Sequence, residues 1–124
     1  MVEYNLASVH EAIEAQSPDR PCIIFRDRYQ SYRDVGDRTR QLANALVARG
    51  LGIRTERDRL ANHESGQSHL ALYLHNGNEY LEGMIGAYKA RVAPCNVNDR
   101  YVAEELAYLL ADARALRGKP CAAG

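Results

Sequence analysis

The second half of the sequence alternates two kinds of periodic segment, and this alternation constrains the fold more than any other feature. Residues 69–74 and 92–97 have the pattern of short strands, whereas residues 78–91 and 102–113 have the period of helices. A strand-helix-strand-helix order predicts a parallel sheet with covering helices, because a parallel connection needs a long crossover. We therefore expect an α/β fold in which βαβα units build a parallel sheet.

Large apolar side chains define the predicted buried faces of these two helices. In residues 78–91 the face comprises Leu81, Met84, Ile85 and Tyr88. Gly83 and Gly86 on the same helix leave room for a close neighbour. In residues 102–113 the face comprises Val102, Leu106, Leu109 and Leu110.

A helix and a hairpin are predicted at the start of the chain. Asn5 can cap the helix, and Tyr4 is placed to form a hydrophobic staple with it. The apolar stripe of this helix comprises Leu6, Val9 and Ile13. Residues 22–25 and 29–32 are extended in pattern and flank Asp27-Arg28, which predicts a hairpin.

The strongest helix signal follows Ser31, which has Asp34 three residues later, as in a capping box. The predicted buried stripe comprises Val35, Thr39, Leu42 and Leu46. Asp34 is also placed to pair with Arg38 one turn later, and Gly50 supplies a left-handed stop. Residues 51–68 carry charge without an apolar period, so we expect a connecting loop there.

Composition restricts the class of protein. The 124 residues are enough for one domain. Sixteen basic residues balance sixteen acidic ones, so the chain has no net positive charge that would attract nucleic acid or an anionic membrane. The longest apolar run, residues 106–111, is far shorter than the roughly 20 residues of a membrane span. The N-terminus has no secretory pattern, so we expect a cytoplasmic protein.

Candidate metal ligands and nucleophiles are scattered. Cys22, Cys95 and Cys121 are odd in number and far apart, so we expect reduced thiols without chemistry. His63, His69 and His75 are spaced by six, which puts the last two at opposite ends of one strand and favours solvated histidines over a metal site. Neither Cys95 with a histidine nor Ser65 with His63 has the setting of a catalytic nucleophile.

The turn at residues 75–79 follows a strand and opens a helix, which is a common place for an anion. It lacks the glycine patterns of dinucleotide and phosphate loops, and Glu79 puts a negative charge where a phosphate would bind. Only two threonines, Thr39 and Thr55, occur in the chain. The sequence therefore favours a structural crossover, with a small nucleotide-binding α/β domain as an alternative.

Three stretches together resemble the opening of AMP-forming acyl-CoA synthetases, most closely the bacterial fatty-acid-CoA ligases. They are the hairpin and capped helix at residues 25–51, the strand and Asn-x-x-Glu type helix at 70–91, and the Glu-Leu-x-Tyr-Leu-Leu type helix at 96–113. The resemblance implies an incomplete N-terminal subdomain at residues 1–116. It also implies an enzyme that uses ATP, Mg²⁺ and coenzyme A to convert a fatty acid into acyl-CoA, AMP and pyrophosphate.

The family's phosphate loop and catalytic lysine have no counterpart here, so we expect no catalytic, cofactor-binding or metal residues and no activity from the fragment alone. Residues 117–124 look unrelated to the family, as a frameshift, premature stop or truncated gene prediction would leave them. Scaffolding in a ligase is the first interpretation. An interaction module that self-associates or docks on a full-length synthetase is the second.

Overall fold

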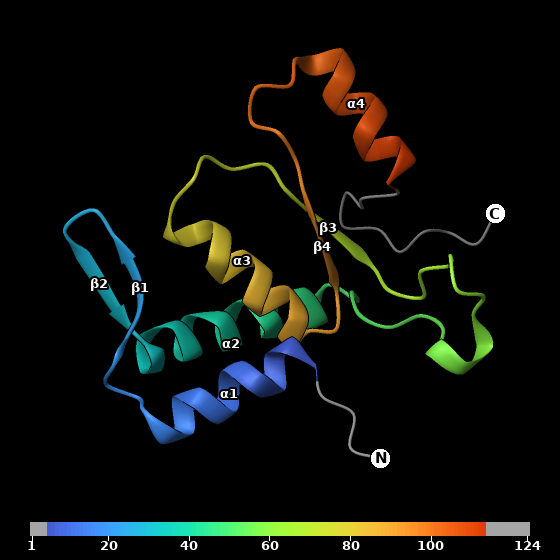
Figure 1. The fold of residues 1–124 in the computed structure, drawn as a ribbon. Helices are drawn as coiled ribbons and strands as arrows, with labels where there is room; N and C mark the ends of the chain where they lie inside the picture. The colour runs from blue at the N-terminus through green and yellow to red at the C-terminus, as the bar shows by residue number, and fades with distance from the viewer. Residues whose placement is uncertain (1–4, 114–124) are drawn as a thin grey trace.

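The computed structural model describes residues 5–113. The helices are α1 (Leu6–Gln16), α2 (Tyr32–Ala48), the short 3-10 helix η1 (Arg57–Arg59), α3 (Asn78–Lys89) and α4 (Ala103–Asp112). The strands are β1 (Pro21–Phe25), β2 (Arg28–Ser31), β3 (His69–Leu72) and β4 (Ala93–Asn96). Helices α1, α2 and α3 lie together on one side of the β3–β4 pair, and α4 lies apart from them beyond the strands (Figure 1).

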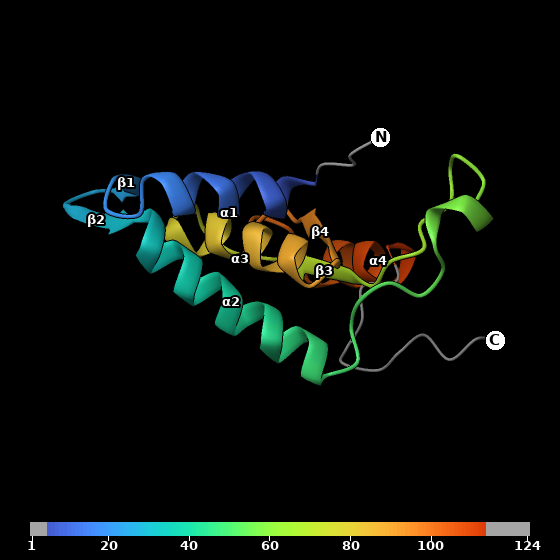
Figure 2. The ribbon, with the colours of Figure 1, turned by 90° about the horizontal axis from the view of Figure 1, so that it is seen from below.

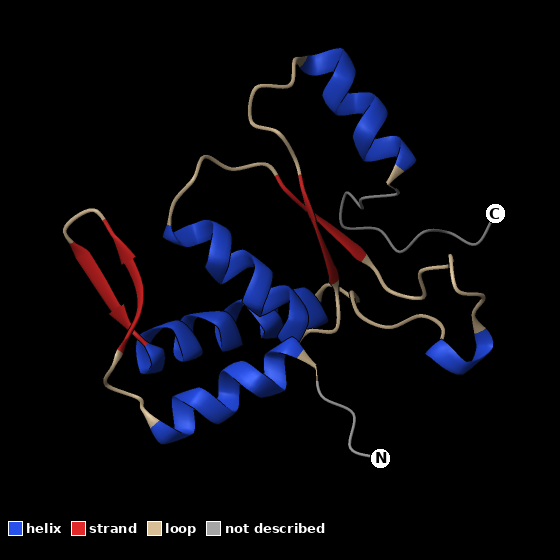
Figure 3. Ribbon diagram, viewed as in Figure 1, coloured by secondary structure: helices blue, strands red, loops and turns tan. Residues whose placement is uncertain are grey.

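Two separate sheets confirm the predicted α/β class (Figure 3). β1 and β2 form the predicted antiparallel hairpin, although the two-residue turn is Arg26-Asp27, because Phe25 pairs with Arg28. β3 and β4 are parallel and in register from His69 with Ala93 onward, with α3 as their crossover. Both strands are shorter than the sequence pattern predicts.

Helix α2 begins and ends as its sequence predicts. The Ser31 hydroxyl accepts from the Asp34 amide at 3.1 Å, and the Asp34 carboxylate accepts from the Ser31 amide at 3.1 Å. At the other end Gly50 has a φ of +79°, and its amide donates to the Val47 carbonyl while the next amide donates to the Leu46 carbonyl. Glycine adopts this left-handed conformation without steric cost, so the helix stops there.

The predicted buried face of α3 is only partly correct. Leu81 is 47% exposed, and Met84, Ile85 and Tyr88 are half-buried. The fully buried residues of the helix are small or polar: Asn78, Glu82, Gly83, Gly86 and Ala87. A Cβ on Gly83 would lie 2.9 Å from Leu72 Cδ2, and one on Gly86 would lie 2.6 Å from Leu42 Cδ2. The prediction that these two glycines admit a close neighbour is therefore confirmed, and the closest contacts of α3 are made by its glycines.

The predicted stripe of α1 is also wrong. Leu6, Val9 and Ile13 are exposed, and the helix instead buries Ala7 and His10. Helix α1 packs on α3, and Glu14 forms a bidentate ion pair with Arg40 of α2, at 2.8 and 3.0 Å. The Tyr4 staple lies outside the described residues.

Helix α4 lies where residues 102–113 were predicted to be helical, one residue shorter at each end, but it does not have the predicted burial. Val102 is 63% exposed, and Leu106, Leu109 and Leu110 are only half-buried. None of the more extensive contacts between described elements involves α4. Its apolar face therefore has no extensive contact with another helix or strand among residues 5–113. The predicted extended piece at 115–116 and the tail at 117–124 lie outside the described residues, and the boundary at residue 116 stays a prediction.

One buried carboxylate joins three elements of the fold. Glu82 of α3 accepts hydrogen bonds from Arg38 Nε and Nη2 of α2, both at 2.9 Å, from Gln30 Nε2 of β2 at 2.7 Å and from Asn78 Nδ2 at 3.3 Å. Burial raises the pKa of Glu82, but these hydrogen bonds outweigh it and hold the pKa below its usual range. The sequence predicted a pair between Arg38 and Asp34, and this prediction is wrong, because Arg38 pairs with Glu82 instead.

Replacing this carboxylate tests its contribution to stability. We expect Glu82→Gln to lower the free energy of unfolding by about 1 to 3 kcal/mol, because charge-assisted bonds are lost inside the fold while Arg38 stays partly solvated. Urea unfolding followed by circular dichroism measures the change. Glu11→Gln, at an exposed acid in the middle of α1, is the control and should change stability by less than about 0.5 kcal/mol. Equal effects of both substitutions would contradict the role given to Glu82.

Candidate functional site

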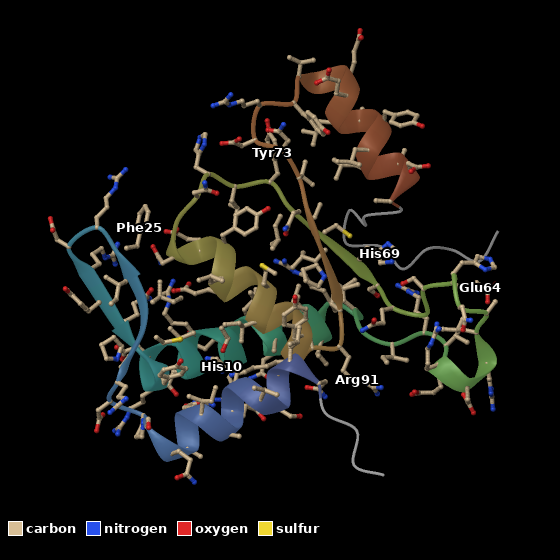
Figure 4. All side chains as sticks on the ribbon, in the orientation of Figure 1. His10, Phe25, Glu64, His69, Tyr73 and Arg91 are labelled. Carbon is tan, nitrogen blue, oxygen red and sulfur yellow. The ribbon has the colours of Figure 1, made fainter. Side chains whose placement is uncertain are left out.

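The turn after β3 and the tip of the hairpin enclose a hollow of about 360 Å³. Phe25, Arg26 and Arg28 line it from the hairpin, and residues 74–79 line it from the turn. The Phe25 ring lies within 4 Å of the position that a Cβ on Gly77 would take, and Figure 4 shows Phe25 at this end of the hairpin. The hollow includes residues 75–79, where the sequence allowed a nucleotide-binding site as an alternative to a structural crossover.

The start of α3 is occupied by a carboxylate of the same chain. Glu79 Oε2 would lie 2.8 Å from a Cβ on Gly77, the residue that caps the helix. A negative charge at this place complements the helix dipole and repels a phosphate. Arg26 stacks over the Phe25 ring with its guanidinium carbon 5.2 Å from the centroid, and His75 Nδ1 lies 2.6 Å from Asp99 Oδ2. The arrangement favours a structural crossover over an anion site.

The three loop and strand-end histidines do not converge. His63 is exposed in the loop, His75 pairs with Asp99, and His69 lies at the start of β3 facing the end of α4. Figure 4 shows His69 beside the β3–β4 pair. No group of three His, Cys, Asp or Glu side chains within residues 5–113 is placed to hold a metal ion.

Ser65 pairs with a different histidine from the one considered in the sequence. Its hydroxyl lies 2.8 Å from His69 Nε2, and His69 Nδ1 contacts the Ala113 carbonyl. Because a carbonyl only accepts, Nδ1 is the protonated nitrogen and Nε2 accepts from the serine. Nucleophilic chemistry would also need a substrate hollow with oxyanion donors. Neither Ser65 nor His69 lines the hollows at residues 74–79, beside β3, between α1 and α2, or on α4. The pair links the loop to the end of α4.

A second polar cluster lies under α1, and the sequence pattern gave no warning of it. His10 is 8% exposed, and its Nδ1 is buried with no hydrogen-bond partner among the residues that the structure describes. Its Nε2 lies 3.9 Å from Cys22 Sγ, and its ring centroid lies 5.7 Å from that of Tyr32. Figure 4 shows His10 between α1 and the helices behind it.

Burial is the main influence on the pKa values of this cluster. Burial, and then the nearby Lys89 ammonium, hold the pKa of His10 below its usual range. Burial raises the pKa of the Cys22 thiol and likewise that of Cys95, so neither is an activated nucleophile. Lys89 itself donates to Thr39 Oγ1 at 2.9 Å. The cluster therefore serves packing. Protonation of the buried His10 is expected to destabilise it, because burial disfavours the charged imidazole.

Comparison with known proteins identifies the family. A family model described as AMP-binding enzyme matches residues 10–116. The chain belongs to this family. It is 52% identical over 112 residues to the medium-chain acyl-CoA ligase Mig of Mycobacterium avium, covering 90% of this chain and 20% of that protein. It is 32% identical over 108 residues to a medium/long-chain-fatty-acid and 3-oxocholest-4-en-26-oate CoA ligase of Mycobacterium tuberculosis, covering 87% and 17%. The family resemblance predicted from the sequence is thus confirmed, and the chain spans about a fifth of the length of these relatives.

Solved structures agree on the fold of this AMP-binding family segment. A putative long-chain-fatty-acid CoA ligase from Rhodopseudomonas palustris superposes with a TM-score of 0.75 at 23% identity, over 91% of this chain and 25% of that one. The N-terminal subdomain of NpsA from Klebsiella oxytoca superposes with a TM-score of 0.72 at 20% identity, over 89% and 25%. The predicted assignment to an N-terminal subdomain of an adenylate-forming enzyme is therefore confirmed at the level of fold. Within the described residues, no helix is both long and apolar enough to cross a membrane.

The buried His10 predicts a specific pH dependence of stability. Its pKa is lower in the folded chain than the value of about 6.5 in an unfolded one, so the unfolded state binds the proton first as the pH falls. The contribution of His10 to stability is expected to be full at pH values above the unfolded pKa of about 6.5 and to be lost as the pH falls through that value toward the lower pKa of the folded state. His10→Gln should flatten this decline in urea unfolding. His63→Gln, at an exposed histidine, is the control and should leave the decline unchanged.

Proposed function

We propose that this chain forms the N-terminal framework of an AMP-forming acyl-CoA ligase that acts on a medium-chain carboxylic acid. The reaction of such an enzyme converts ATP, the acid and coenzyme A into acyl-CoA, AMP and pyrophosphate. The observation that carries the proposal is the 52% identity to a medium-chain acyl-CoA ligase over nine-tenths of this chain. The second relative, which is named for medium and long chains, supports the same class of substrate.

The framework role rests on a test of whether the described residues fit ATP. A triphosphate needs successive backbone amides, hydroxyls and cations around its oxygens. The Thr39 hydroxyl is buried, donates to the Val35 carbonyl at 2.7 Å and accepts from Lys89. The best-placed helix N-terminus is covered by Glu79. The residues present therefore do not fit ATP, and we assign no catalytic step to them.

An exchange of segments tests the proposed function. In the M. avium ligase Mig, the segment that matches this chain is replaced by the matching residues of this chain. We expect this chimera to keep ATP- and coenzyme A-dependent thioester formation from a medium-chain acid such as decanoate, within about tenfold of Mig, because only framework packing changes. Steady-state release of pyrophosphate and of acyl-CoA measures the rate.

The 124-residue chain alone supplies the complementary measurement. It should release no pyrophosphate with ATP, Mg²⁺ and decanoate, because its polar groups are committed to one another. A Mig chimera that carries an unrelated segment of equal length is the control and should be inactive. A folded but inactive chimera with this chain, or pyrophosphate release from the chain alone, would overturn the proposal.

A further inference from the structure

Helix α1 is held to the rest of the described chain by little apolar area. Its contacts with other elements are made mainly with α2 and α3, and Figure 2 shows it at the edge of this group of helices. Ala7 is its one buried apolar residue, because Leu6, Val9 and Ile13 are exposed. Local opening of α1 therefore needs less free energy than unfolding of the core.

The connection after α1 is bound to the start of α2. The Pro18 carbonyl accepts from the Arg33 amide at 2.9 Å, and the Arg20 carbonyl accepts from the Tyr32 amide at 3.0 Å. The ion pair that joins α1 to α2 involves Glu14, which lies in the last turn of the helix, next to this fixed end. The attachment of the first two turns therefore depends on the buried residues Ala7 and His10.

The surroundings of His10 do not suit a charged imidazole. A protonated ring has two N–H donors, and both need acceptors when they are buried. Nδ1 is buried without a partner among residues 5–113, and Nε2 faces only Cys22 Sγ, which is 3.9 Å away and a weak acceptor. Burial raises the pKa of the Cys22 thiol, so it offers no negative charge either. A released helix would expose His10 to water, which supplies both acceptors.

Charged groups face His10 from each helix packed around it. Lys89 of α3 and Arg40 of α2 oppose a proton on the imidazole, whereas Glu14 and Glu11 of α1 favour it. Burial has the largest effect and, together with the two cations, holds the pKa of His10 below its usual range. Hydrogen bonds from Arg40 hold the pKa of Glu14 below its usual range too, so their ion pair stays charged in mild acid. His10 is therefore the group of this cluster that gains a proton there.

We propose that α1 is an acid-released helix: protonation of His10 frees its first two turns from α2 and α3 and uncovers Cys22, while the rest of the described fold stays in place. Because one proton is involved, the ratio of released to attached helix rises by at most about tenfold per pH unit below about 6.5, where a solvated imidazole titrates. The inference goes beyond the acyl-CoA ligase function and does not depend on it.

The reaction of Cys22 with a thiol reagent measures the release. Dithiodipyridine forms mixed disulfides in mild acid as well as at neutral pH, and dividing each rate by that of the urea-unfolded chain at the same pH removes the titration of the thiol itself. From about pH 7.5 to about pH 5.5, this normalised rate should rise roughly three- to tenfold at Cys22. It should stay constant at Cys95, which is half-buried in β4. Peptide mapping by mass spectrometry separates the two thiols.

Two substitutions identify the titrating group. His10→Gln keeps a polar side chain that takes no proton, so the pH dependence of the normalised Cys22 rate should vanish. His63→Gln, at an exposed histidine of the loop, is the matched control and should keep it. A pH dependence that survives in His10→Gln, or that disappears in His63→Gln, assigns the effect to another group and overturns the proposal.

Amide hydrogen exchange in the unsubstituted chain supplies a second measurement, which does not require His10→Gln to fold. A short helix without packing partners is marginal in water, so its amides exchange once it is released. After correction for intrinsic rates, protection at Val9 should fall about three- to tenfold over the same pH range, whereas protection at Leu46 in the core should stay. Equal loss at both residues indicates global unfolding, and no loss at Val9 indicates that α1 stays attached; either result refutes the proposal.

Discussion

The fold depends on how closely α3 approaches its neighbours. Gly83 lies against Leu72 of β3 and Gly86 lies against Leu42 of α2, at distances where a Cβ would collide. These contacts let one crossover helix pack on the parallel pair and on α2 at once. The core follows from this, since Ala43, Leu46, Ala87, Ala90 and Val92 gather around that junction. A larger residue at either glycine would separate the helix layer from the strands.

Close helix packing also explains why so much of the interior is polar. The fully buried residues of α3 are small or polar, so they contribute little buried apolar area to the contacts between helices. Hydrogen bonds and ion pairs add to those contacts. Glu82 joins α3 to α2 and the hairpin, and Lys89 joins α3 to the buried Thr39. Glu14 does the same for α1, because its carboxylate lies over Gly36 of α2 and pairs with Arg40. Removing one partner of such a pair is costly, because the other group is left without its partner.

Local signals in the sequence predicted the element order, and long-range contacts decided the burial. The Ser31 cap, the Gly50 stop and the α3 glycines were all recognisable, because each acts within a turn or through the absence of a side chain. The large residues Leu6, Leu81 and Val102 were assigned to the interior because apolar spacing was taken as burial. A better indicator of the buried face of α3 is Glu82, which lies on the same side of the helix as the glycines. When such a carboxylate is buried, it requires a cationic partner on another element.

Three polar side chains that could bind a phosphate are engaged at the junction between α2 and α3. The Thr39 hydroxyl binds Lys89 and a backbone carbonyl, and Arg38 binds Glu82. A substrate could reach these groups only by breaking contacts that hold the two helices together. These side chains therefore act as framework within the described residues.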